Sequence, residues 1–221
     1  MRRLVVQTFL SLDGVMQAPG GPEEDPTGGF EHGGWTVNYG DDATDQVMGE
    51  AMGVPFDLLL GRKTYEIFAA HWPYARDEPF AARLNDATKY VVSSTLKTLA
   101  WQNSRIVTGD VAAGVARIKA EAGPELQVLG SGELVRTLLE TPGLVDELRL
   151  LIFPLVLGKG KRIFGERSAL AGWDLVRSTS STTGVLMATY RAAPARPAGS
   201  FALGQPSDAE IERRRRWERE Q

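Results

Sequence analysis

The segment at residues 128–139, VLGSGELVRTLL, joins an apolar strand to an amphipathic helix through a Gly-Ser-Gly corner. Leu134, Val135, Leu138 and Leu139 recur at helical spacing after the corner. A strand that runs directly into a helix is the repeating unit of α/β folds. The corner is either a tight turn or a cradle for phosphate, because the first turn of a helix has backbone N–H groups without partners.

The same alternation of strand and helix extends in both directions from this segment. Short apolar runs predict strands at residues 4–12, 56–60, 89–93, 105–108 and 125–129. Helical patterns lie between them, and the clearest begins at Asp110. Later strands, at residues 147–153, 173–178 and 185–191, follow one another without a long helix. The order predicts an α/β fold with a central, mostly parallel sheet and an antiparallel edge.

Composition excludes several classes of function. The chain has 221 residues, no cysteine, two histidines and a formal net charge of −3. Disulfides, zinc–thiolate sites and cysteine nucleophiles are therefore excluded, and no metal site is expected. No basic field indicates a nucleic-acid partner. No apolar run approaches the ~18 residues that span a membrane, so no membrane partner is expected. The start, RRLVVQTFLSL, has no cleavage motif, and we expect a first strand and a cytoplasmic protein.

The chain divides into a body, an arm and a tail. We expect residues 1–191 to form one domain. Residues 192–206 are rich in proline, alanine and glycine, which predicts a linker or an extended arm. Residues 207–221 predict a charged helix whose arginines are interleaved with glutamates, which favours a solvated or partner-docking surface over nucleic-acid binding. The loop at residues 19–35 is rich in glycine, proline and acids, which favours a functional lid.

Polar residues follow three of the predicted strands, where ligands bind in open α/β sheets. GRKT at residues 61–64 combines close backbone approach, positive charge and a helix N-terminus. Ser93 and Ser94 offer hydroxyl groups, and GSG at residues 130–132 offers free N–H groups. Each motif is alternatively an ordinary turn. The corner lacks the third glycine of a dinucleotide-binding fingerprint and the Gly-Lys-Ser/Thr of a Walker loop.

Taken in order, GRKTYE after an apolar strand, a strand ending in Ser-Ser and VLGSG entering a helix resemble the dihydrofolate reductase-like superfamily. The matching branch contains the reductase domain of riboflavin-biosynthesis deaminase-reductases. Its marks are SLDG at residues 11–14 and VDELRLLIFPLVLGKGKRIF at residues 145–164, and the similarity covers residues 3–191 approximately. The resemblance implies a sheet of eight or so strands flanked by helices, NADPH as reductant, and a homodimer paired through the late strands.

The resemblance also implies roles for individual residues. Residues 61–64 would meet the cofactor phosphates, Ser93 and Ser94 the adenosine 2′-phosphate, residues 130–134 the pyrophosphate and the nicotinamide side, and Gln17 and Ala18 the nicotinamide. The complete implied cofactor set is Gln17, Ala18, Gly61, Arg62, Lys63, Thr64, Ser93, Ser94, Gly130, Ser131, Gly132, Glu133 and Leu134.

Three departures from the family bear on the substrate. Asp41, Asp42 and Asp45 stand at a helix start and cap it equally well, so they do not assign folate reduction. Two histidines without cysteine cannot form the deaminase zinc site, so the protein would be a stand-alone reductase domain. The acidic loop at residues 19–35 would repel a phosphorylated substrate.

Further residues are candidates for the chemistry itself. Asp13 either polarises the substrate or donates a proton through water, or it is a turn residue before Gly14. Trp35 and Phe68 either line an aromatic substrate pocket or pack in the core. Lys159 and Lys161 either bind a substrate anion or are solvated in their loop.

The sequence thus predicts an NADPH-dependent oxidoreductase that transfers a hydride to a small heterocyclic, pteridine- or pyrimidine-like substrate. Such an activity would be similar to that of 5-amino-6-(5-phosphoribosylamino)uracil reductase or dihydrofolate reductase. Arg62 and Lys63 favour NADPH over NADH, because a 2′-phosphate needs a cationic partner. The alternative is a catalytically inactive nucleotide-binding sensor that acts through its C-terminal tail.

Overall fold

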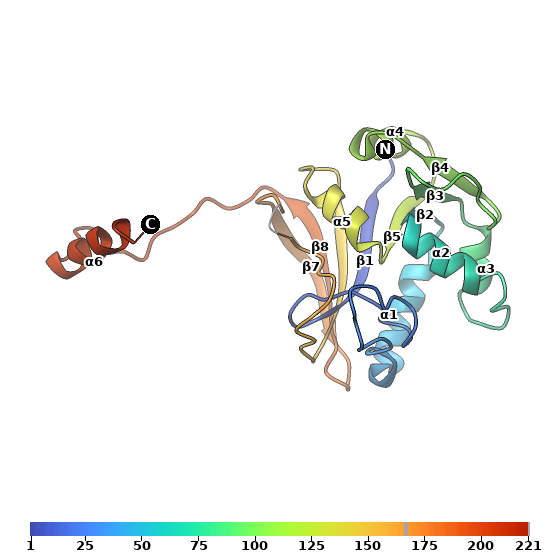
Figure 1. Cartoon of the computed structure of the whole chain (residues 1–221), viewed down its shortest axis with the longest axis horizontal. Coiled ribbons are helices and arrows are strands. Elements are labelled where there is room, and N and C mark those ends of the chain that lie inside the picture. The colour runs from blue at the N-terminus through green and yellow to red at the C-terminus, as the bar shows by residue number, and fades with distance from the viewer. Residues whose placement is uncertain (166–167, 221) are drawn as a thin grey trace.

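An eight-stranded sheet forms the centre of the molecule in the computed structural model, which describes residues 1–165 and 168–220 (Figure 1). The strand order is β4-β3-β2-β5-β1-β6-β8-β7. The strands are β1 Leu4–Ser11, β2 Phe56–Gly61, β3 Lys89–Val92, β4 Ser104–Val107, β5 Glu125–Leu129, β6 Glu147–Phe153, β7 Gly172–Ser180 and β8 Leu186–Ala193. The first six strands pair in parallel, whereas β8 is antiparallel to both β6 and β7. The predicted mostly parallel α/β sheet with an antiparallel edge is confirmed.

Local signals in the sequence set the helix ends. Asp41 and Thr44 form a capping box at the start of the first long helix, and Asp110 accepts a hydrogen bond from the N–H of Ala113. Ser207 caps the last helix in the same way. The helices are α1 Asp42–Gly53, α2 Arg62–His71, α3 Ala81–Asp86, α4 Val111–Ala120, α5 Gly132–Leu139 and α6 Asp208–Glu218, with a short 3₁₀ helix, η1, at Val37–Tyr39.

Five of these helices cover the sheet on two faces. Alternate residues of the central strands point to opposite faces, so Leu59 packs with α4 and α5 while Leu58 and Leu60 pack with α1, α2 and α3. Figure 1 shows α4 and α5 on one side of the sheet and α1 on the other. The lid loop contributes Phe30 and Trp35 to a third apolar cluster beside β6 and β8.

The helices that follow two neighbouring strands pack on opposite faces of the sheet. The position between these two strands is the topological switch point of the sheet. Helix α2 follows β2 and leads to β3 on one face, whereas α5 follows β5 and leads to β6 on the other. Strands β2 and β5 are adjacent in the sheet. Ligands of open α/β sheets bind beyond the carboxyl ends of the strands at such a point.

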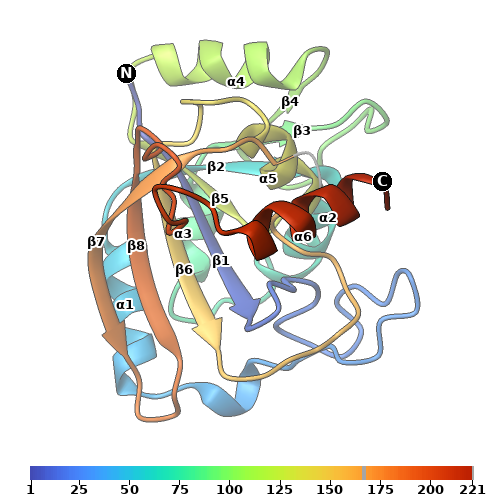
Figure 2. The same cartoon turned by 90° about the vertical axis from the view of Figure 1, so that its left-hand side faces the viewer.

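The tail extends away from the sheet. Figure 1 shows an extended arm that leaves β8 and carries α6 beyond the edge of the sheet, and Figure 2 shows β7, β8, β6 and β1 side by side. No residue of α6 is buried. Residue 221, the last of the predicted tail, lies outside the described residues. Among the described helices, none combines the length and the apolar character needed to cross a membrane.

Candidate functional site

Two helix N-termini are joined at the switch point. The backbone N–H of Gly61, before α2, donates to Ser131 Oγ over 3.0 Å. The backbone N–H of Ser131, before α5, donates to Thr64 Oγ1 over 3.1 Å. Neither helix has a side-chain cap: the N-cap of α2 is Gly61, which has no side chain, and the N-cap of α5 is Ser131, whose hydroxyl accepts from Gly61 instead. The first-turn N–H groups of both helices therefore remain available to an anion.

The Gly-Ser-Gly corner is shaped for this contact. Gly130 and Ser131 both adopt left-handed backbone angles, with φ of 67° and 59°. Glycine tolerates this conformation, and a β-carbon on Gly132 would lie 3.2 Å from Met16 Sδ. The two glycines thus let the start of α5 approach Met16, in the loop after β1, and Thr64, on α2, closely.

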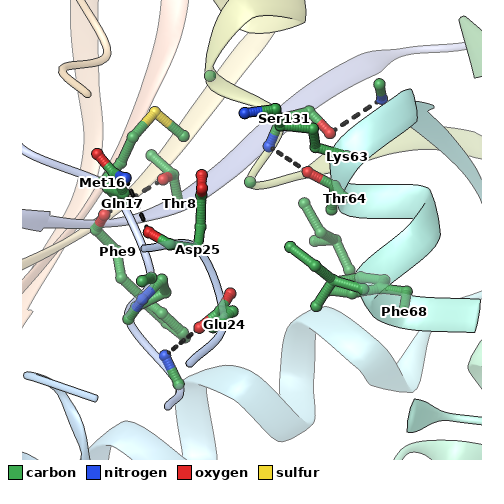
Figure 3. A pocket seen from close by; sticks show the side chains of 18 of the residues that line it. Thr8, Phe9, Met16, Gln17, Glu24, Asp25, Lys63, Thr64, Phe68 and Ser131 are labelled. Atoms are coloured by element: carbon green, nitrogen blue, oxygen red, sulfur yellow. Dashed lines mark hydrogen bonds between the residues drawn. The ribbon is translucent and has the colours of Figure 1, made fainter. Parts of the chain in front are cut away.

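A cavity of about 560 Å³ opens above the two N-termini. Figure 3 shows Thr64 and Ser131 on one side, Gln17 on the other, and Glu24 and Asp25 between them. The volume is in the range of small-molecule and cofactor sites. The members of the predicted set that line the cavity are Gln17, Ala18, Gly61, Arg62, Lys63, Thr64, Phe68, Gly130, Ser131, Gly132, Glu133 and Leu134.

The cations of the cavity gather at this cradle. Among its described lining residues, the positively charged ones are Arg62, Lys63 and Lys161. Arg62 pairs with Glu66 one turn along α2, at 2.9 Å. Burial, followed by the nearby charge of Lys161, lowers the pKa of Lys63. Two close ammonium groups repel each other, so an anion placed between them would be stabilised.

The loop at residues 19–35, the predicted lid, contributes residues to the cavity lining and is bound to other residues of that lining. Gln17 Nε2 donates to the carbonyl oxygens of Asp25 and Thr27, each over 2.8 Å. Thr27 Oγ1 accepts from Lys161 Nζ at 2.9 Å and from Lys63 Nζ at 3.2 Å, and Lys161 also pairs with the Asp25 carboxylate. Burial alone would raise the pKa of Asp25, but hydrogen bonds from Lys161 and Thr27 outweigh it and lower that pKa. The loop is thus held by one ion pair, between Lys161 and Asp25, and by hydrogen bonds to the carbonyl oxygens of Asp25 and Thr27 and to Thr27 Oγ1.

Glu24 contributes a second carboxyl group to the cavity wall. One of its oxygens accepts the backbone N–H of Gly20 over 2.6 Å. Burial raises the pKa of Glu24, and the backbone hydrogen bonds only partly offset this effect. Unlike Asp25, Glu24 has no ion pair among the contacts described for this chain. It is the carboxyl group of this wall that retains a proton most readily.

The remaining part of the cavity is apolar and lies under α1, α2 and α3. Its walls include Met48, Met52, Phe68, Trp72 and Phe80. Phe68 and Trp72 meet edge to face with ring centroids 6.1 Å apart. Walls of this kind suit a planar ring.

Asp13 lies outside the cavity lining. Its carboxylate accepts hydrogen bonds from Ser11 Oγ at 2.7 Å and from the N–H groups of Leu157 and Gly158 at 3.0 and 2.9 Å. It also pairs with Arg162 at 3.1 Å. Burial would raise the pKa of Asp13, but these hydrogen bonds outweigh it and lower the pKa to about 2. The contacts fasten the end of β1 to the loop after β6, and such a carboxylate is a poor proton donor at neutral pH.

Four other predicted residues also lie outside the cavity lining. Ser93 Oγ accepts the N–H groups of Thr95 and Leu96, which stabilises the turn after β3, and Ser94 is exposed. Trp35 is buried in the core and its indole N–H donates to the carbonyl of Gln17, so it helps to position Gln17 without lining the cavity itself. Lys159 is exposed and donates to the carbonyl of Gly29 over 3.2 Å.

Several cavity residues carried no motif in the sequence. Gln7, Thr8 and Phe9 lie in the middle of a strand, and only their proximity to SLDG pointed to the site. Met48 and Met52 resemble ordinary core residues of an amphipathic helix. Glu24 and Asp25 were visible only as acids of a loop, and the fold brings both to the cavity lining together with Lys161, a candidate named from the sequence.

Comparisons with known proteins identify one relative over most of the chain and a second over about half of it. The protein is 26% identical over 198 residues to the uncharacterized protein YyaP of Bacillus subtilis, covering 86% of this chain and 94% of that protein. It is 28% identical over 112 residues to the uncharacterized protein YwjB of the same organism, covering 49% of this chain and 58% of that protein.

Solved structures share the fold. One, from Shewanella sp. PV-4, is named "Putative riboflavin biosynthesis protein" and matches with a TM-score of 0.60 at 20% identity, covering 86% of this chain and 99% of that chain. A pyrimidine reductase-like protein from Corynebacterium diphtheriae matches with a TM-score of 0.56 at 13% identity, covering 87% and 92%. The sequence pattern of the RibD C-terminal domain matches residues 2–187. The chain therefore belongs to the RibD C-terminal domain family.

Proposed function

We propose that the protein is an NADPH-dependent reductase of a small heterocyclic, pteridine- or pyrimidine-like substrate. Membership in the RibD C-terminal domain family makes the chain a reductase-like protein of the riboflavin-pathway type. The observation that carries the finer proposal is the pair of uncapped N-termini, of α2 and α5, cross-linked through Ser131 and Thr64 above a cavity of about 560 Å³.

The cradle fits a dinucleotide because it offers what a pyrophosphate needs. First-turn N–H groups of two helices point to one space, and the positive ends of both helix dipoles meet there. Arg62 and Lys63 add the cationic partners that favour NADPH over NADH. Gln17, fixed by the lid and by the N–H of Lys161 at 3.1 Å, would border the nicotinamide. When bound, NADPH supplies the hydride.

The chain's own residues would orient the substrate, exclude water and hold the proton. The apolar walls at Met48, Met52 and Phe68 would take the ring. The lid, held by Gln17 and Lys161, would cover it. Glu24 would supply the proton, because its pKa is raised by burial and its carboxyl lies in the cavity wall. Asp13 is left out of the chemistry because its contacts place it in the support of the loop.

Self-association is a further part of the proposal. Strands β7 and β8 form the antiparallel edge, and Leu175, Val176 and Leu186 on these strands are exposed apolar side chains. A homodimer paired through this edge would cover them. Light scattering of the purified chain should give the mass of a dimer, and Leu175→Lys should shift it toward the monomer.

Calorimetric titration with NADPH and NADH tests the central proposal. NADPH should bind more tightly than NADH, and reduced nicotinamide should then be oxidised in the presence of pteridine or pyrimidine substrates. Binding without oxidation of any such ring would favour the inactive nucleotide-binding sensor. Absence of binding for both nucleotides would reject the cofactor site.

A further inference from the structure

Gln7 lines the cavity and has a buried amide oxygen without a hydrogen-bond partner. It lies on β1, is 4% exposed, and lines the cavity together with Met48 and Phe68. Its Nε2 donates to Met48 Sδ over 3.3 Å, and its Oε1 is buried without a hydrogen-bond partner. The large majority of buried side-chain polar atoms in proteins have a hydrogen-bond partner, so such an oxygen is unusual.

The amide can turn toward the cavity at little cost. A thioether sulfur is a weak acceptor, so the contact with Met48 restrains the amide only weakly. The terminal torsion of glutamine is broad, which allows its oxygen to rotate into reach of a ligand. A donor brought by a ligand would satisfy an atom that now has no partner, and the surrounding side chains would exclude competing water.

We propose that Gln7 determines substrate specificity by accepting a hydrogen bond from a ring N–H of the bound heterocycle. The inference rests on the proposed reductase function and specifies its substrate class: a planar ring with an unsubstituted N–H, such as an imide or lactam of a pteridine or pyrimidine. The ring would lie against the apolar walls at Met48 and Phe68, where a neutral hydrogen bond is not screened.

A second buried glutamine provides a matched control. Gln127 lies on the neighbouring strand β5, is 0% exposed and also has an unpartnered Oε1. Its Nε2, however, donates to the carbonyl of Ala51 and to Glu125, and Gln127 is not among the described residues that line the cavity. A substitution at Gln127 therefore reproduces the loss of a buried amide without touching the proposed contact.

The test compares two probes of nearly the same shape, lumazine and 1,3-dimethyllumazine, in titrations of the full chain. Lumazine offers ring N–H groups and the dimethyl form offers none. The wild-type protein should bind lumazine at least about tenfold more tightly, because the methylated ring leaves the Gln7 oxygen unpaired. In Gln7→Leu the ratio should fall to about twofold or less, whereas Gln127→Leu should keep the wild-type ratio. Gln7→Met, which also lacks an acceptor oxygen, repeats the test should the leucine variant fold poorly.

Three results would overturn the inference: no saturable binding of lumazine by the wild-type chain, equal affinity for the two probes, or a ratio that persists in the folded Gln7 variants. The last would show that the methyl groups are rejected by size alone. A separate titration of the wild-type chain with NADPH distinguishes these failures from failure of the reductase proposal, since the lumazine measurements need no cofactor.

Discussion

The backbone N–H of Gly61 donates to Ser131 Oγ across 70 residues of sequence, over 3.0 Å. In most helix starts a serine hydroxyl at this position caps its own helix. Here the Oγ of Ser131 instead binds the chain before α2, and Thr64 returns the contact to the N–H of Ser131. The two helix N-termini are thereby fixed side by side while their first-turn N–H groups stay free for a ligand.

Ser131→Ala should weaken both this cross-link and cofactor binding. The N–H of Gly61 would lose its acceptor, which should lower the free energy of unfolding by about 1 kcal/mol, and NADPH affinity should fall about tenfold. Ser131→Gly removes the same oxygen but relieves the left-handed φ of 59°, so it should cost less stability for a similar loss of affinity. Denaturant titration and calorimetry measure the two effects. Ser104→Ala, at a hydroxyl with only a 3.5 Å contact, is the control. Wild-type affinity in Ser131→Ala would show that the cross-link does not serve the cofactor.

Arg62→Ala should reduce the preference for NADPH over NADH. Arg62 lies at the first position of α2, and a 2′-phosphate near it would lose a cationic partner, so NADPH affinity should fall about tenfold while NADH affinity changes little. Glu66→Gln is the matched variant, because it releases Arg62 from its ion pair at 2.9 Å and should not weaken NADPH binding. Equal losses for both nucleotides in Arg62→Ala would place the 2′-phosphate elsewhere.

The strand ends at Gly61 and Gly130 could be predicted because their motifs are local. Apolar runs ending in glycine, followed by helical spacing, determine both the strand and the turn, and the parallel sheet then brings such ends to one edge. The same reasoning pointed to the loop at residues 19–35 from its composition, and part of that loop lines the cavity. Local patterns therefore predicted the fold class, whereas the cradle for a cofactor stays a prediction.

The lid contacts and the apolar wall could not be predicted in this way. Lys161 and Lys159 stand in the same glycine-rich loop and differ only in where the folded loop points them, so the sequence offered no basis for choosing between them. Gln7 carries no motif because its role depends on what α1 places over it. Asp13 was a plausible acid in sequence, and only its partners at Leu157, Gly158 and Arg162 show how fully it is engaged.

Asp13→Asn should destabilise the fold without affecting NADPH affinity. The amide cannot accept all the donors that the carboxylate binds, so the free energy of unfolding should fall by about 1–3 kcal/mol at neutral pH. Because the folded pKa of about 2 lies below the ordinary 3.8, the carboxylate stabilises the fold above pH 4 or so. The difference between wild type and variant should therefore narrow as pH falls toward 2. Unfolding titrations at several pH values measure this. A fall in turnover with unchanged stability would instead assign Asp13 to catalysis.

Glu24→Gln should remove the pH dependence of turnover. If Glu24 supplies the proton, the wild-type rate should fall as pH rises through the raised pKa of its carboxyl group, and the variant should be slower and nearly flat with pH. The stability of the fold should depend on pH in the same direction. The folded state holds the Glu24 proton more tightly than the unfolded state, so the free energy of unfolding of the wild type should also decline as pH rises toward the raised pKa of Glu24. Glu23→Gln, at the exposed neighbouring residue, is the control and should retain the wild-type profile. An unchanged profile in Glu24→Gln would require another proton source.

Lys161→Met should loosen the lid, whereas Lys159→Met should not. Lys161 Nζ binds the Asp25 carboxylate and Thr27 Oγ1, while the contact described for Lys159 Nζ is with the carbonyl of Gly29. Loss of the Lys161 contacts frees the lid and removes a charge from the cradle, so residues 19–35 should exchange amide hydrogens faster and NADPH affinity should fall about fivefold to tenfold. Hydrogen exchange read by mass spectrometry and calorimetry on both variants measure these effects. Both variants remove one positive charge from the same loop. A difference between them therefore reports the location of the lysine and not the loss of charge. A larger loss of turnover in Lys159→Met would favour the anion-binding role that the sequence suggested for Lys159.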